Sequence, residues 1–198
     1  MPRTRSPLPP RQRILAAALT TFSHRGVAAS SIAEVATAAG MSKQALMHHF
    51  RTKEELRDAV YAFLAEGLRA VFPAVAGELV RLPQDYGGVI ALVSERLTKN
   101  PEIARFLVHE LLSEPEQLIG WLRTETAPWL GLVRGVIEQD KARARGKAFE
   151  IDVDAHLTVL MGVMLMISAL VPRKDKRWFA RVHTAALSVM RLGSHVEV

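Results

Sequence analysis

Four side chains that could read DNA bases are clustered at Lys43, Gln44, Met47 and His48. At ~100° per residue in a helix, they share one outward arc. Lysine donates to the O6 and N7 atoms of guanine, glutamine pairs with N6 and N7 of adenine, and methionine contacts the methyl group of thymine. The spacing therefore predicts a helix face suited to the major groove of double-stranded DNA.

A helix must precede this face and hold it in place. Ser31-Ile-Ala-Glu34 has the form of a capping box, in which the serine hydroxyl accepts from the third helical amide and the glutamate reaches back. The pattern predicts a helix over 31–39, with Ile32, Val35, Ala36 and Ala39 on its inner side. Gly40 follows directly, where a left-handed residue that ends a helix is least strained.

The helix that carries the face is predicted over 42–50. Ser42 can cap its start, and Leu46, His49 and Phe50 are expected on its inner side. Two short helices joined by a glycine-containing turn form a helix-turn-helix.

Helical periodicity extends over the remaining chain, and no run alternates as a half-buried strand would. The first helix is expected over 11–24, and a fourth from Lys53 to Pro73. Five further helices follow from breaks at Pro83–Gly88, Asn100–Pro101, Glu114–Pro115, Arg145–Gly146 and Pro172. The fold class is therefore all-α, with about nine helices.

The positive charge is concentrated in the first third of the chain. The 198 residues carry a net charge of +6, and residues 1–60 hold nine basic and four acidic residues, a net charge of +5. A polyanion is thus expected to dock there. Lys53 adds a cation to a helix start, which is a frequent arrangement for holding a phosphate.

Residues 1–10 contain four prolines and two arginines, and are expected to be a disordered arm. The alternative is an arm that touches the phosphates or the minor groove of DNA. We expect the helix-turn-helix domain to cover 11–56 and a second domain to cover 57–198.

Several classes of protein are disfavoured. The chain has no cysteine, which excludes disulfides, thiolate zinc sites and cysteine nucleophiles. His48 and His49 point about 100° apart on a helix, so no metal site is expected. The longest apolar run, Leu157–Val171, is shorter than the ~20 residues of a membrane span. A cytoplasmic protein without cofactor, enzyme activity or membrane attachment is expected.

Three stretches together resemble the amino-terminal domain of TetR-family transcriptional regulators. They are Arg13-Ile-Leu-Ala-Ala-Ala-Leu-Thr-Thr-Phe-Ser-His-Arg-Gly26, Ser30-Ser-Ile-Ala-Glu-Val-Ala-Thr-Ala-Ala-Gly-Met-Ser42 and Leu46-Met-His-His-Phe-Arg-Thr-Lys-Glu-Glu-Leu56. The resemblance covers about residues 11–60 and its combined motif is specific.

The resemblance implies which residues touch DNA. The major groove would be faced by Lys43, Gln44, Ala45, Met47 and His48. Phosphates would be held by Ser30 or Ser31 and by Lys53, with Ser42 at the start of the recognition helix. Family members usually have tyrosine where this chain has Met47, so the hydrogen bond of a tyrosine hydroxyl to the DNA backbone is given up. We expect Met47 to contact a thymine methyl or to pack.

For the second domain, the resemblance implies a helical ligand-binding and dimerisation domain. Leu157–Val171 and Arg177–Leu192 suit a four-helix interface between two subunits. The alternative is that both are ordinary core helices of a monomer.

The candidates for a pocket are aromatic, methionine and polar residues: Phe106, His109, Glu110, Trp121, Trp129, Met161 and Met164. Their composition suggests a largely apolar small molecule, although such residues also form plain cores. The leading hypothesis is a homodimeric repressor that binds a palindromic operator and is released by a small-molecule inducer. The alternative is an α-helical small-molecule-binding protein or enzyme without a role in DNA regulation.

Overall fold

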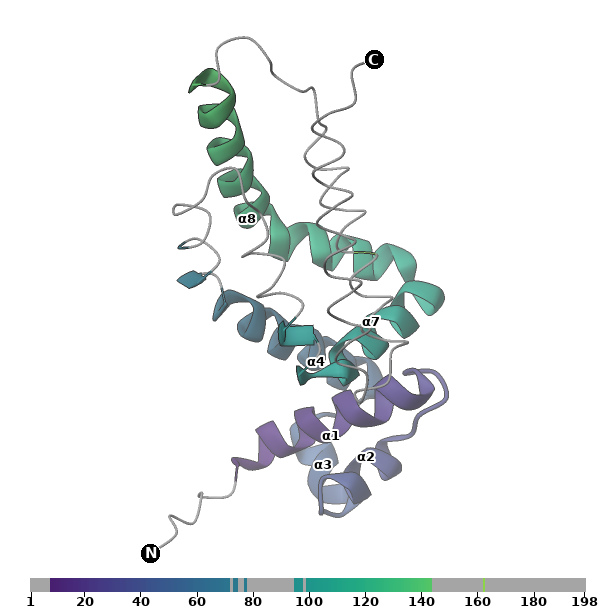
Figure 1. The fold of residues 1–198 in the computed structure, drawn as a ribbon. Helices are drawn as coiled ribbons and strands as arrows, with labels where there is room; N and C mark the ends of the chain where they lie inside the picture. Colours follow the sequence, from purple (N-terminus) through teal and green to yellow (C-terminus); the bar gives the residue numbers. More distant parts are fainter. Residues whose placement is uncertain are drawn as a thin grey trace, which may run out of the picture.

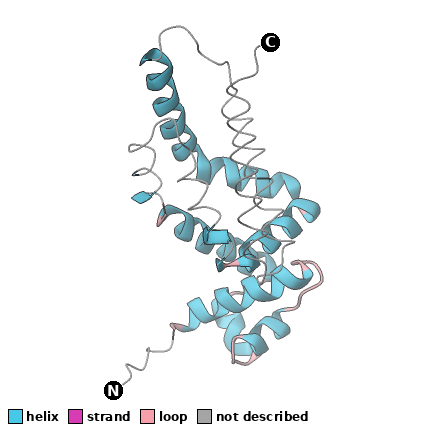
Figure 2. Ribbon diagram, in the orientation of Figure 1, coloured by secondary structure: helices cyan, strands magenta, loops and turns pink. Residues whose placement is uncertain are grey.

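All regular structure that the computed structural model describes is helical (Figure 2). It describes residues 8–71, 73–74, 77, 95–97, 99–143 and 162. Within these ranges the helices are α1 (Pro10–Arg25), α2 (Ile32–Ala38), α3 (Lys43–His49), α4 (Lys53–Arg69), α7 (Pro101–Ser113) and α8 (Pro115–Arg143). The expected total of about nine helices is not confirmed, since the described part of the chain holds six.

The helix-turn-helix begins where the capping residues predict. The Ser31 hydroxyl accepts from the Glu34 amide at 3.2 Å, and a Glu34 carboxylate oxygen accepts from the Ser31 amide at 2.8 Å, so the capping box is confirmed. Ser42 caps α3 by accepting from the Ala45 amide at 3.1 Å. Thr52 caps α4 in the same way. Side-chain hydrogen bonds to nearby backbone amides thus determine where α2, α3 and α4 begin.

Two glycines with positive φ follow helices of this domain. Gly40, in the turn between α2 and α3, has φ 68°, as its position after α2 predicts. Gly26, after α1, has φ 75° and ψ 164°, a combination that is essentially restricted to glycine. The chain therefore leaves α1 and enters the turn after α2 through backbone conformations that residues with a Cβ rarely adopt.

One hydrophobic core joins the helix-turn-helix to the helices that follow it. In α1, Ile14, Ala18 and Phe22 are fully buried. The ring of Phe22 stacks on that of Phe106 in α7, with ring centroids 6.4 Å apart. Figure 1 shows α1 lying between the short helices α2 and α3 and the rest of the described fold. The expected boundary between 56 and 57 lies inside α4.

The later described helices follow the predicted proline breaks. α7 begins at Pro101 and α8 at Pro115. α8 is 29 residues long, contains Pro128 and extends away from the helix-turn-helix (Figure 1). Of the described helices, none combines the length and the apolar content that a bilayer span requires. The segments expected at the dimer interface, Leu157–Val171 and Arg177–Leu192, lie outside the described residues except for Gly162.

Candidate nucleic-acid interface

The outer face of α3 is free of contacts with the core. Its exposed residues are Lys43, Gln44, Ala45, Met47 and His48. The side chain of Met47 is 41 % exposed, although it is a large apolar residue. A cation, an amide and a thioether thus lie together on one exposed surface, and each of these groups is able to contact a base edge.

The inner side of α3 is anchored by two residues. Leu46 is fully buried and Phe50, which directly follows the helix, is 2 % exposed. The expectation that His49 also faces inward is wrong, because His49 is exposed. Leu46 and Phe50 lie four positions apart and fill the inner stripe, whereas His49 lies about 100° away from Phe50 and faces water.

Lys53 ties the start of α4 to the loop between α1 and α2. Its Nζ donates to the carbonyl oxygen of Ala28 at 2.9 Å and to that of Ser30 at 3.2 Å. Ammonium carries three donors, so one remains for a phosphate. Lys53 therefore holds the helix-turn-helix together as well as bringing positive charge to its surface, a role that spacing alone did not indicate.

The two serines before α2 have different environments. Ser30 is 4 % exposed and its hydroxyl donates to the Gly26 carbonyl at 2.7 Å. Ser31 is exposed and caps α2. Of this pair, Ser31 is the one that we retain as a phosphate contact.

Arg11 lies over the ring of Phe50, with its guanidinium carbon 5.4 Å from the ring centroid. This cation–π contact fixes a positive charge beside the end of α3. The two residues are far apart in the sequence, so no local motif indicates that they meet.

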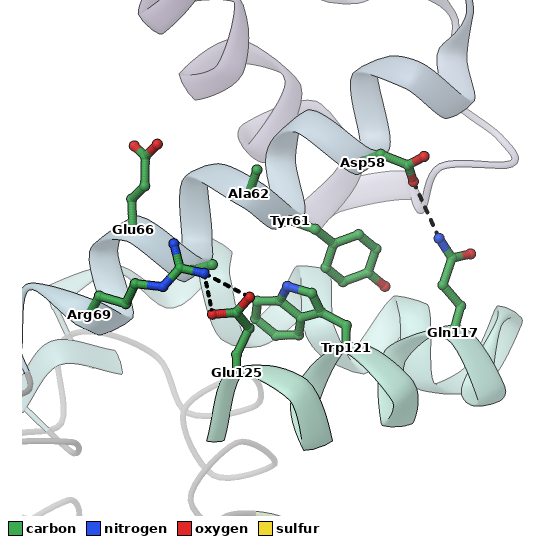
Figure 3. Close-up of a pocket in the computed structure, with 9 residues that line it drawn as sticks. Asp58, Tyr61, Ala62, Glu66, Arg69, Gln117, Trp121 and Glu125 are labelled. Atoms are coloured by element: carbon green, nitrogen blue, oxygen red, sulfur yellow. Dashed lines mark hydrogen bonds and ion pairs between the residues drawn. The ribbon is translucent and has the colours of Figure 1, made fainter. Parts of the chain in front are cut away.

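The described residues among those that the sequence suggested for a small-molecule pocket have different surroundings. Phe106 is fully buried in the core, and Glu110 is 1 % exposed. His109 packs against Gly26, at the end of α1. Trp121 lines a groove between α4 and α8 (Figure 3). The side chain of Trp129, and Met161 and Met164, lie outside the described residues.

Glu110 is held by the hydroxyl of Tyr61, which donates to its Oε2 at 2.9 Å. Burial raises the pKa of the Glu110 carboxyl group above its ordinary value. Burial and the bond to Glu110 raise the pKa of the Tyr61 hydroxyl. The pair is a polar contact between α4 and α7 within a hydrophobic junction.

No described group of three histidine, aspartate or glutamate side chains has the geometry for a metal ion. The candidate site is the surface built from the outer face of α3, the start of α4 and Arg11.

The fold and the candidate site are those of a helix-turn-helix protein, in which this domain is followed by further helices. Residues 14–60 match the model of the bacterial regulatory proteins of the tetR family. Over 51 residues the chain is 41 % identical to the HTH-type transcriptional regulator AcrR of Shigella flexneri, and this segment is 26 % of the chain and 24 % of that protein. The match to the tetR family thus lies in the helix-turn-helix domain and covers about a quarter of the chain.

The fold is similar to that of solved structures over most of its length. A tetR-family regulatory protein from Rhodococcus RHA1 has a TM-score of 0.69 at 22 % identity, with 90 % of this chain and 95 % of that chain covered. FadR from Bacillus subtilis, solved with stearoyl-CoA, has a TM-score of 0.68 at 15 % identity, with 92 % and 98 % covered. KstR2 of Mycobacterium tuberculosis, a ketosteroid transcriptional regulator, has a TM-score of 0.67 at 17 % identity, with 93 % and 96 % covered.

Proposed function

We propose that the chain is a transcriptional repressor that binds a palindromic DNA operator as a homodimer and leaves it when a small molecule occupies the second domain. The observation that carries the DNA-binding part is the exposed outer face of α3, held between the buried anchors Leu46 and Phe50. In this proposal Lys43, Gln44, Ala45, Met47 and His48 face the major groove. Ser31, Ser42 and Lys53 lie towards the phosphates.

The distribution of charge also supports the outer face of α3 as the surface that binds DNA. α3 contains no carboxylate, and the first 60 residues hold most of the net positive charge. The Arg11 guanidinium beside Phe50 adds a cation next to the end of α3. Such charge accelerates encounter with DNA and supplies the part of the affinity that does not depend on sequence.

A dimer suits this geometry because two recognition helices about 34–36 Å apart reach successive major grooves. An inducer can release DNA only if it binds more tightly to an arrangement that fits the operator poorly. α4 and α1 carry that coupling in our proposal, since both contact the helix-turn-helix and α7. FadR, which was solved with stearoyl-CoA, and KstR2, a ketosteroid transcriptional regulator, support a largely apolar inducer.

Fluorescence anisotropy on labelled duplexes from the DNA that flanks the gene tests the proposal. We expect one duplex to bind selectively, with affinity that falls steeply between 50 and 200 mM salt, as for proteins that make several phosphate contacts. The stoichiometry should be two chains per duplex, and the mass in solution twice 21.9 kDa. Binding that does not distinguish any duplex would favour the alternative, a small-molecule-binding protein or enzyme without a role in DNA regulation.

The base-reading role is tested with Gln44→Ala. This variant should lose about 1–3 kcal/mol of discrimination at one base pair in each half-site. Gln117→Ala removes the same type of side chain from α8, outside the proposed contact face, and should keep the discrimination. A uniform loss of affinity for all duplexes in Gln44→Ala would contradict base reading by this residue.

A further inference from the structure

The thioether side chain of Met47 is exposed to solvent on the outer face of α3. Of the seven methionines in the chain, the structure describes Met41 and Met47, and their surroundings differ. Met47 is 41 % exposed, whereas Met41, in the turn before α3, is partly buried and packs against the hydrophobic core. A reagent dissolved in water therefore reaches the side chain of Met47 more easily than that of Met41.

The reagent class that this side chain invites is a hydroperoxide. The chain contains no cysteine, so no thiolate competes for the oxidant. A lone pair of the thioether sulfur attacks the outer oxygen of the peroxide, and an S–O bond forms as the O–O bond breaks. The proton of the attacked oxygen moves to the leaving oxygen, which becomes water or an alcohol. Sulfur loses two electrons, the peroxide gains them, and reductases later restore the thioether from the sulfoxide.

Oxidation changes the chemistry that Met47 offers to DNA. The thioether is apolar and packs favourably against a thymine methyl group in the major groove. The sulfoxide is polar and chiral, and its oxygen accepts hydrogen bonds. Placing that oxygen against an apolar methyl group removes its water without supplying a donor, which is unfavourable. The same position thus changes from one that favours contact with DNA to one that opposes it.

Lys43 lies one helical turn before Met47 and would be affected as well. Residues four positions apart are neighbours on a helix surface, and both of these side chains are exposed. α3 contains no carboxylate that would hold the Lys43 ammonium group. That group is therefore able to donate a hydrogen bond to a sulfoxide oxygen on Met47. Such a bond would turn the Lys43 cation away from the base edges that it is proposed to contact.

We propose that Met47 is a reversible modification site, at which a hydroperoxide oxidises the thioether to the sulfoxide and thereby weakens the binding of DNA to the outer face of α3. The selective oxidation of Met47 is a property of the protein alone, whereas its effect on DNA rests on the proposed function. DNA bound to this face covers Met47, so the operator should also slow its oxidation. The device responds to oxidant and needs no ligand in the second domain.

Peptide mapping by mass spectrometry tests the modification itself. The full chain is treated with dilute hydrogen peroxide without DNA, and the fraction of each methionine that has gained one oxygen atom is followed over time. We expect Met47 to be oxidised at least about fivefold faster than Met41, because susceptibility follows exposure. A saturating operator duplex should slow oxidation at Met47 and leave the rate at Met41 unchanged. A rate at Met47 no higher than that at Met41 would overturn the proposal, whether or not the protein binds DNA.

Fluorescence anisotropy on the operator duplex tests the effect on DNA, with each protein compared before and after the same peroxide treatment. We expect the wild type and Met41→Leu to lose affinity about tenfold, while their urea midpoints stay unchanged. Reductases for the two sulfoxide epimers should restore the affinity. Met47→Leu, compared with its own untreated form, should change little.

The outcomes separate this proposal from the proposed function. Untreated protein that selects no duplex would contradict the proposed function, and with it the effect of oxidation on DNA. Untreated protein that selects a duplex and keeps its affinity after Met47 is oxidised would overturn the present proposal alone. An equal loss of affinity in treated Met47→Leu would do the same, because the loss would then arise at another residue.

Discussion

The hydroxyl of Tyr61 in α4 donates to a carboxylate oxygen of Glu110 in α7, 49 positions further along the chain, at 2.9 Å. Both residues are buried, Tyr61 at 4 % and Glu110 at 1 % exposure. The ring of Tyr61 also packs edge-on against Phe106, with centroids 5.5 Å apart. The contact between α4 and α7 therefore combines a directed hydrogen bond with aromatic packing, which fixes the relative position of the two helices.

Removing the hydroxyl should be costly because Glu110 then lies buried without this partner. We expect Tyr61→Phe to lower the free energy of unfolding by about 1–3 kcal/mol in urea denaturation. The double variant Tyr61→Phe/Glu110→Met leaves no polar group unsatisfied there and should recover most of that loss. A double variant whose loss equals the sum of the two single losses would contradict a role for the hydrogen bond.

The raised pKa of Glu110 predicts how stability depends on pH. A carboxyl group whose pKa is higher in the folded state stabilises the fold fully below its ordinary pKa of 4.5, and this contribution is lost as pH rises through the folded-state pKa. Glu110→Gln does not titrate. The free energy of unfolding of the wild type, relative to that of Glu110→Gln, should therefore fall as the pH rises above 4.5.

Urea denaturation of both proteins at increasing pH measures the difference. Neighbouring groups that titrate or carry charge are Tyr61, Arg57, His109 and Glu114, and their contributions are shared by both proteins. A difference that is constant with pH, or that grows in favour of the wild type, would show that burial does not hold the carboxyl group protonated.

Lys53 and Lys43 should respond differently to the same substitution. Lys53→Met loses two hydrogen bonds to the loop before α2, so it should lose about 1 kcal/mol of stability and bind all DNA sequences more weakly. Lys43 is exposed on α3, and Lys43→Met should keep the stability while changing the preference at one base pair. Urea midpoints and anisotropy on matched duplexes separate the two effects. Equal stability of both variants would be inconsistent with a stabilising role for the two hydrogen bonds that Lys53 donates to the loop before α2.

Gly26 and Gly40 form a second matched pair. Gly40 has φ 68° and open space around the position of a Cβ, so Gly40→Ala should cost only the backbone strain of about 1–2 kcal/mol. At Gly26 the φ and ψ values are unfavourable for alanine, and a Cβ would lie 3.4 Å from His109 Nδ1. We expect Gly26→Ala to lose about 3 kcal/mol in thermal or urea unfolding. A smaller loss of unfolding free energy in Gly26→Ala than in Gly40→Ala would contradict the interpretation that Gly26 is the more constrained position.

The sequence predicted the parts of the molecule that depend on local chemistry. Ser31 with Glu34, Gly40 and Ser42 define the helix-turn-helix within a few residues, because caps and left-handed turns are decided by near neighbours. The exposed face of α3 follows from helical spacing. The prediction failed at His49, where the space next to the core was already taken by Leu46 and Phe50.

Contacts between residues that are far apart in the chain could not be predicted from the sequence. Lys53 reaches the loop before α2, Arg11 meets Phe50, and Tyr61 pairs with Glu110 only because the helices pack in one particular way. Composition suggested Glu110 and Trp121 as candidates for a pocket, but it did not indicate that Glu110 is buried or that Trp121 lines a groove between α4 and α8.

The stacking of Phe22 on Phe106 limits how far the helix-turn-helix can be separated from the helices that follow it. A fragment that ended at residue 56 would leave Phe22 facing water and would lack Val60 and Tyr61, which complete the same core. Exchange of recognition modules between related proteins would thus require α4 and the facing surface of α7 to be transferred together with α1–α3. The unit that can be inherited or engineered as a module is larger than the helix-turn-helix that carries the proposed DNA contacts.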